Sequence, residues 1–304
     1  MGQWVGRGSG ALASALAASV ALAGCMAVDA VRAQDRPAME SGGQGDAQVD
    51  AGALDRSGLT YADLADLVGT ASLIALVEIR DQAEVERERA PGLAPGDARL
   101  FLQARTEALL AGRSAVGESL TFLADRVLRE NGRAPKVRKQ RFVVFADPVA
   151  GSPGQLQLVD PKAMVPADPA FVERLRRVIA TFAAPDLPPV VTGVRDVISV
   201  PGNLAGESET QMFVETVTGA PASLSVIRRP GMAPSWGVSW SEIVDASARP
   251  PEAETAGWYR LACGLPAQLP SDAFLQASGP ARRQAEEDYR FVLEQLGPCS
   301  RSRT

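Results

Sequence analysis

The chain has 304 residues, a formal net charge of −5 and no histidine. The mild acidic balance argues against nucleic acid as a partner, because nucleic-acid binding requires a concentrated basic surface. The absence of histidine excludes Ser-His-Asp and Cys-His catalysis and histidine-ligated zinc, so an enzyme here would use carboxylates, lysine, or serine with lysine. The sequence has no glycine-rich phosphate loop, CxxC pair or dinucleotide fingerprint, and we expect neither a cofactor nor a metal.

The N-terminal region has the pattern of an export signal. Residues 11–22 form an uncharged, apolar run behind a short segment with one cation, Arg7. A membrane-spanning helix needs about 20 apolar residues, so this shorter run predicts a cleaved signal peptide over residues 1–24. Residues 25–57 are rich in Gly, Asp, Gln, Ala and Ser and hold hardly any large apolar side chain, which predicts a flexible tether.

Two possible cleavage sites follow the apolar run. Leu-Ala-Gly-Cys at residues 22–25 resembles the lipobox of bacterial lipoproteins. The resemblance implies that Cys25 is alkylated by a diacylglyceryl group and becomes the new N-terminus, anchored on the periplasmic side of the cell envelope. The alternative is an ordinary signal-peptidase cut after Ala33, at the small-x-small pattern of residues 31–33, which would give a soluble periplasmic protein.

The two cysteines beyond the tether are Cys263 and Cys299. An even pair of cysteines in an oxidising compartment is usually bonded, so we predict a disulfide between them. The alternative is two unpaired thiols, because a single pair offers no spacing pattern.

Residues 58–165 are predicted to hold one helix and five strands. Thr60 is a possible N-cap for a helix over residues 59–67. Apolar or alternating runs, separated by turn residues, predict strands at 72–80, 98–110, 119–124, 141–146 and 155–159. This succession of short strands favours a small antiparallel barrel, closed or half-closed.

The rest of the chain is predicted as a linking helix and connector, residues 166–189, and a β-plus-helix domain, residues 190–304. Asp168 is the expected N-cap of the linking helix and Pro169 its first residue. Apolar periodicity then predicts a meander of strands and two helices, at 190–200, 211–217, 222–228, 235–240, 252–263 and 281–296. The expected fold class is therefore α+β, mainly β.

The strand pattern of residues 58–165, with Leu-Leu-Ala-Gly at 109–112 and Arg-Phe-Val-Val-Phe at 141–145, resembles OB-like barrels of the netrin-module type. The resemblance covers about 100 residues and implies a fold. Netrin-like families include protease inhibitors, but the N-terminal cysteines that those inhibitors use are absent here, so no inhibitory activity is implied.

A second resemblance is carried by residues 206–211, 242–245 and 258–263. These segments resemble uncharacterised exported proteins and lipoproteins of alphaproteobacteria over residues 59–270. The resemblance implies that the chain is an exported alphaproteobacterial protein, and it implies no activity.

Two pairs of residues are candidate sites. Glu207 and Glu209 would share one face of a strand, where two carboxylates can bind a hard cation or act as an acid/base pair; the alternative is a polar, solvated start of a strand. Trp236 and Trp240 would also share a face, where exposed indoles can stack on a sugar ring. Val238 between them favours a buried, structural role.

These features predict a non-catalytic envelope lipoprotein that acts through protein-protein contacts. The expected partners are the membrane, reached through the N-terminal lipid, and an envelope protein. Two alternatives stay open. One is a carboxylate-dependent hydrolase of envelope sugars centred on Glu207 and Glu209, and the other is a carbohydrate-binding module that uses Trp236 and Trp240.

Overall fold

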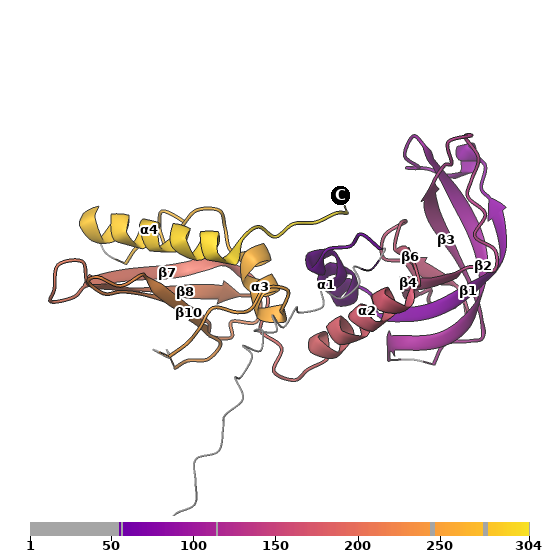
Figure 1. Cartoon of the computed structure of the whole chain (residues 1–304). Coiled ribbons are helices and arrows are strands. Elements are labelled where there is room, and N and C mark those ends of the chain that lie inside the picture. Colours follow the sequence, from indigo (N-terminus) through magenta and orange to yellow (C-terminus); the bar gives the residue numbers. More distant parts are fainter. Residues whose placement is uncertain (1–54, 56, 114, 244–246, 276–278, 304) are drawn as a thin grey trace, which may run out of the picture. The chain divides into compact units, whose positions relative to one another are not determined.

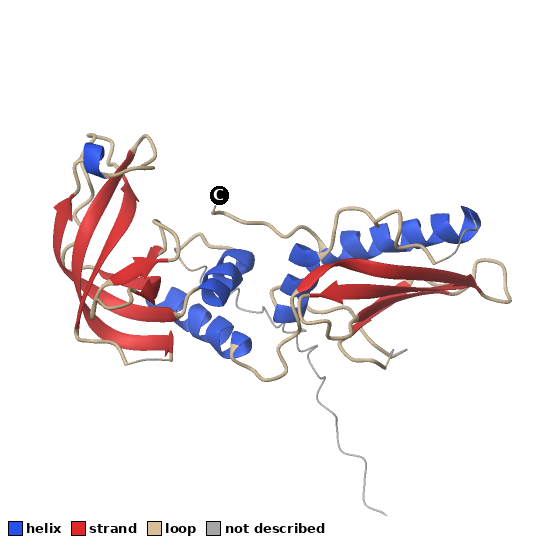
Figure 2. Ribbon diagram, turned by 180° about the vertical axis from the view of Figure 1, so that it is seen from behind, coloured by secondary structure: helices blue, strands red, loops and turns tan. Residues whose placement is uncertain are grey.

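The protein is described from a computed structural model, which covers residues 55, 57–113, 115–243, 247–275 and 279–303. All of these residues belong to one compact unit, Asp50–Thr304. Within this described part the fold is α+β and mainly β, with antiparallel sheets of six and four strands and four α-helices (Figures 1 and 2). The predicted signal peptide, Cys25 and most of the predicted tether lie outside the described residues.

The first sheet confirms the five predicted strands and adds a sixth. Its strands are β1 (Leu73–Glu84), β2 (Asp97–Gly112), β3 (Ser119–Val127), β4 (Arg141–Pro148), β5 (Leu156–Leu158) and β6 (Met164–Pro166), with a short 3-10 helix, η1 (Arg87–Arg89), between the first two. The strand order is β3-β2-β1-β4-β5, and β6 pairs with β4. The sixth strand has three residues and ends in Pro166, so it shows no alternation of apolar and polar side chains.

The predicted barrel is not closed in the described part of the chain. The ladders leave β3 and β5 as the two edges, and an isolated parallel bridge between Thr121 and Gln155 joins them. Because β5 has three residues, no ladder forms along β3. The backbone N–H groups of Thr121 and Asp125 donate instead to the loop carbonyls of Gly154 and Pro161, at 2.8 and 2.7 Å.

Two helices complete the core of the first sheet. In α1 (Tyr61–Thr70) Thr60 is the N-cap, as predicted, and it forms a capping box with Asp63. In α2 (Pro169–Phe182) Asp168 caps the first turn and Pro169 begins the helix, as predicted. The two helices pack on each other, and Phe171, Leu175 and Val178 of α2 belong to the same buried core as the first sheet.

The second sheet is the predicted meander. Its strands are β7 (Val191–Pro201), β8 (Ser208–Thr216), β9 (Ser223–Arg228) and β10 (Ser235–Ser239), in the order β10-β9-β8-β7. Gly219 and Gly231 take positive φ angles of 70° and 73° in the turns that follow β8 and β9. The predicted helices are α3 (Ala256–Gly264) and α4 (Gly279–Leu296), and α4 lies along the sheet (Figure 1).

A buried carboxylate fixes α4 to the second sheet. Asp288 of α4 is 0% exposed and accepts hydrogen bonds from Thr210 Oγ1 (2.5 Å), Arg228 Nε (2.5 Å) and Gln284 Nε2 (3.1 Å). The partners come from β8, β9 and α4 itself. Burying a charge is costly unless it is paired and hydrogen-bonded, and here each carboxylate oxygen has a donor.

We expect Asp288→Ala to lower the free energy of unfolding by about 3 kcal/mol, because it leaves the partly buried Arg228 without its carboxylate partner. Chemical denaturation measures this. Glu286→Ala, which removes an exposed partner of Arg282 on the same helix, is the matched control and should cost less than about 0.5 kcal/mol. Equal losses in the two variants would contradict the structural role of Asp288.

Candidate functional site

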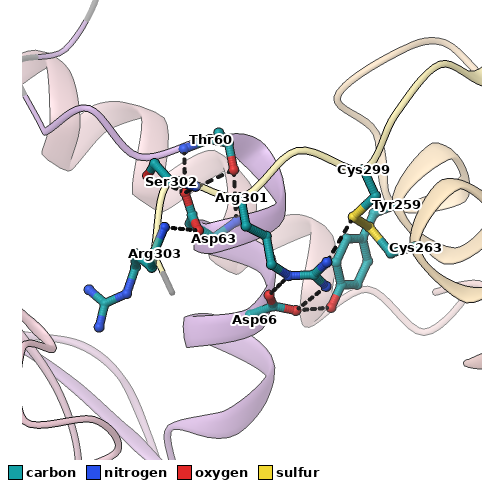
Figure 3. Close-up of polar contacts among 9 residues, drawn as sticks. All are labelled: Thr60, Asp63, Asp66, Tyr259, Cys263, Cys299, Arg301, Ser302 and Arg303. Carbon is teal, nitrogen blue, oxygen red and sulfur yellow. Dashed lines mark hydrogen bonds and ion pairs between the residues drawn. A yellow bond between two sulfur atoms is a disulfide. The ribbon is translucent and has the colours of Figure 1, made fainter.

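The densest set of polar contacts between distant parts of the chain joins α1 to residues 297–303, here called the arginine segment (Figure 3). Gly297, with a φ angle of 69°, follows the last residue of α4. Cys299 is bonded to Cys263 of α3, so the structure contains the predicted disulfide. The bond holds the beginning of the arginine segment beside α3.

Asp63 of α1 is the centre of these contacts. Asp63 is 2% exposed. Its carboxylate accepts hydrogen bonds from the backbone N–H groups of Thr60 (2.8 Å), Ser302 (3.0 Å) and Arg303 (3.2 Å). The Ser302 hydroxyl donates to the same carboxylate at 2.6 Å. Burial acts to raise the pKa of Asp63, but the hydrogen bonds from Ser302 and Thr60 outweigh it and lower the pKa to about 2. The carboxylate is therefore ionised across the ordinary pH range.

Asp66, one turn further along α1, binds a second part of the arginine segment. It accepts from Arg301 Nε (2.6 Å) and Nη2 (3.3 Å) and from the phenol of Tyr259 (2.6 Å), a residue of α3. Burial raises the pKa of Tyr259 to about 12, and the hydrogen bond to Asp66 and its negative charge act in the same direction. The phenol therefore stays protonated and donates to Asp66.

Asp160 supplies a third carboxylate, from the loop after β5. Arg303 Nη2 donates to it at 2.8 Å, and Arg303 Nη1 donates to the Lys162 carbonyl at 3.4 Å. A cavity of about 190 Å³ lies among these groups. We call this surface the acidic groove, and its lining residues from outside the arginine segment are Asp63, Asp66, Leu67, Thr70, Val159 and Asp160.

Sequence reasoning found the disulfide but not the acidic groove. Asp63 and Asp66 stand in an amphipathic helix, where acidic residues are normally solvated, and their partners lie up to 240 positions away. No local spacing signals such a contact. The sequence feature that could have pointed to the acidic groove is the pair of arginines that flank Ser302.

Glu207 and Glu209 have separate partners in the structure. Glu207 precedes β8, and its Oε2 accepts from the backbone N–H groups of Asn203 (3.0 Å) and Leu204 (3.2 Å), which closes the turn between β7 and β8. Glu209 is exposed within β8 and accepts from Gln211 Nε2 at 2.9 Å. The first glutamate thus has a local structural use, and the second is a solvated strand residue.

Trp236 and Trp240 do not form an exposed pair. Trp236 is 5% exposed and belongs to the core of the second sheet. Trp240 lies just beyond β10 and is partly buried against the same core. The structural role favoured by Val238, which packs beside them, fits these positions.

No group of three or more metal-ligating side chains occurs among the described residues. In the same part of the chain, no helix is both long and apolar enough to cross a membrane. Cys25, the predicted lipidation site, lies outside the described residues. A scan against protein-family models and a search of curated proteins each found no match.

The lowered pKa of Asp63 predicts a loss of stability in acid. Because its folded-state pKa of about 2 lies below the ordinary value of 3.8, the carboxylate contributes stability above about pH 4 and loses it as the pH falls toward 2. We expect a contribution of about 2 kcal/mol, because each tenfold change in proton affinity corresponds to about 1.4 kcal/mol.

Chemical denaturation of the wild type and Asp63→Asn at pH 7 and pH 2.5 measures this contribution. The wild type should be the more stable at pH 7, and the difference should shrink in acid. Asp81→Asn, at an exposed position, should keep the wild-type pH dependence. A pH-independent difference between wild type and Asp63→Asn would contradict the assignment.

The disulfide is expected to stabilise the fold by up to about 4 kcal/mol, the chain-entropy value for a sequence separation of 36 residues. The double variant Cys263→Ser/Cys299→Ser should therefore unfold at lower denaturant concentration. Cys25→Ser should leave the unfolding midpoint unchanged, because Cys25 is not part of the pair. A double variant as stable as the wild type would contradict the prediction.

Proposed function

We propose that this chain is an exported protein on the periplasmic side of the cell envelope, held by a lipid on Cys25, and that it acts without catalysis through contacts with another envelope protein. The location is supported by the export pattern of residues 1–24 and the lipobox-like residues 22–25. The Cys263–Cys299 disulfide also supports it, because such bonds persist in oxidising compartments.

The contact function is supported above all by an exposed apolar pair on the first sheet. Phe101 of β2 and Leu123 of β3 are direct cross-strand partners, and they are 39% and 45% exposed. Val127, further along the same face of β3, is 67% exposed. A solvated sheet face normally carries polar side chains at such positions, and grouped apolar ones mark interaction sites. We call Phe101, Leu123 and Val127 the contact face.

An ion pair lies within the contact face, between the Phe101–Leu123 pair and Val127. Arg99 and Asp125 form the neighbouring cross-strand pair, joined by two hydrogen bonds, from Arg99 Nε (2.7 Å) and Nη2 (2.8 Å) to the carboxylate. A bidentate ion pair of this kind is well ordered. An interface on this face would therefore combine apolar side chains with a paired charge, and protein-protein interfaces contain both.

We further propose that residues 58–165 are an OB-like module. The proposal is supported by the connectivity: β1, β2 and β3 form a meander, β4 pairs with β1, and β5 pairs with β4. The parallel bridge between Thr121 and Gln155 brings the two sheet edges together. OB folds are five-stranded, partly open barrels with this type of order.

In-cell crosslinking followed by purification from solubilised envelopes tests the contact function. We expect one stoichiometric partner with the wild type, and its loss both in Cys25→Ser and in Phe101→Ser/Leu123→Ser. The matched control Leu204→Ser/Met232→Ser removes two exposed apolar side chains from turns of the second sheet and should keep the partner. A partner unaffected by the contact-face variant, or no specific partner, would contradict the proposal.

Membrane fractionation of the same cells tests the anchor. The wild type should sediment with membranes as the cleaved, lipid-bearing form. Cys25→Ser should either be soluble or keep its uncleaved signal peptide. A soluble wild type would instead support cleavage after Ala33.

A further inference from the structure

The arginine segment lies in the acidic groove as a bound peptide would. Residues 301–303 are in neither a helix nor a strand. Two of their backbone N–H groups, those of Ser302 and Arg303, donate to the single carboxylate of Asp63. Main-chain capture by a fixed acceptor, combined with side-chain contacts on either side, is a common mode of recognition for extended peptides.

The side-chain contacts define a short sequence pattern. Asp66 binds the guanidinium of Arg301, Asp63 binds the hydroxyl of Ser302, and Asp160 binds the guanidinium of Arg303. Three carboxylates thus face two cations, which gives the groove a charge complementary to its occupant. Arginine suits such a site because its planar fork donates to carboxylates in a fixed geometry.

We propose that the acidic groove is a binding site for extended peptide segments in which two arginines flank one small residue, and that the arginine segment occupies this site in cis. Two of its carboxylates are oriented by groups outside the segment: the capping box of α1 holds Asp63, and Tyr259 donates to Asp66. The cavity of about 190 Å³ beside the arginines, lined by Leu67, Thr70 and Val159, leaves room for a further side chain of a longer ligand.

The disulfide determines how strongly the arginine segment competes with a peptide from another chain for the acidic groove. Cys299 is two residues from Arg301 and is bonded to α3, whose Tyr259 already contacts Asp66. A short covalent connection of this kind gives the segment an effective concentration in the millimolar range. A peptide from another chain therefore binds the groove weakly while the arginine segment occupies it. The same peptide binds tightly once the segment is released or its arginines are substituted.

This inference names the class of partner that the proposed function leaves open. Use of the groove by an envelope protein rests on the proposed function, whereas peptide binding by the purified protein does not. The two are separable by experiment, because the contact face is on β2 and β3, whereas the groove is formed by α1 and the loop after β5.

The test measures binding of a fluorescent, end-capped peptide Ser-Arg-Ser-Arg, the sequence of residues 300–303, to the purified full-length mature protein. The variant Arg301→Ala/Arg303→Ala, which weakens the cis occupant, should bind the peptide saturably. The wild type should bind it at least about tenfold more weakly, because its own segment competes. The peptide Ser-Ala-Ser-Ala should bind neither protein.

Groove variants are made in the same Arg301→Ala/Arg303→Ala background. Asp66→Asn/Asp160→Asn should weaken peptide binding by about tenfold or more; both positions are partly exposed, so the fold tolerates the change. The control Asp81→Asn/Glu209→Gln removes the same charge elsewhere and should change binding by less than about twofold, after screening by 0.15 M salt.

Three results would overturn the proposal. The first is an absence of peptide binding by Arg301→Ala/Arg303→Ala when its unfolding transition matches the wild type. The second is an equal effect of the groove variant and the charge-matched control. The third is equal affinity of the wild type and Arg301→Ala/Arg303→Ala, which would mean that the cis segment does not occupy the binding site.

Discussion

The carboxylate of Asp63 is the interaction on which the arrangement around α1 depends. It closes the capping box at the start of the helix and also accepts the backbone of Ser302 and Arg303. A side chain that serves only as a cap needs one or two donors and can remain solvated. Here the additional donors come from far along the chain, and they allow the carboxylate to be buried without losing its charge.

The second sheet uses the same physical solution at another place. Asp288 is buried between α4 and the sheet, and its oxygens are satisfied by Thr210 and Arg228. Buried carboxylates add little net stability compared with a well-packed apolar side chain, but they admit few alternative packings because each donor must be in place. Both carboxylates therefore define the position of a helix more than they strengthen its burial.

The sequence was sufficient for features that leave a local pattern. Alternating apolar residues predicted the long strands, and the Asp168-Pro169 pair predicted the start of α2. The cysteine count predicted the Cys263–Cys299 bond. The three-residue β6 was missed because it ends in Pro166 and shows no alternation of apolar and polar residues. Of the two predicted forms of the barrel, the closed one does not occur in the described part of the chain, where β5 is short and a single bridge joins it to β3.

The polar contacts were beyond sequence reasoning for a different reason. Asp63 and Asp66 are ordinary residues of an amphipathic helix until the arginine segment is placed beside them, and that placement depends on packing across more than 200 positions. Glu207 drew attention through its spacing from Glu209, yet its partners are backbone N–H groups of its own turn. Spacing along a strand says which side chains share a face, not what they bind.

The disulfide also bears on the order in which long-range contacts form during folding. The Tyr259–Asp66 and Arg301–Asp66 contacts span 193 and 235 positions, so each would separately require the closure of a long loop. Once Cys299 is joined to Cys263, docking of Tyr259 carries Arg301 to the same carboxylate, and one closure serves both. Oxidation before docking thus shortens the conformational search, whereas a reduced chain must find the two contacts independently.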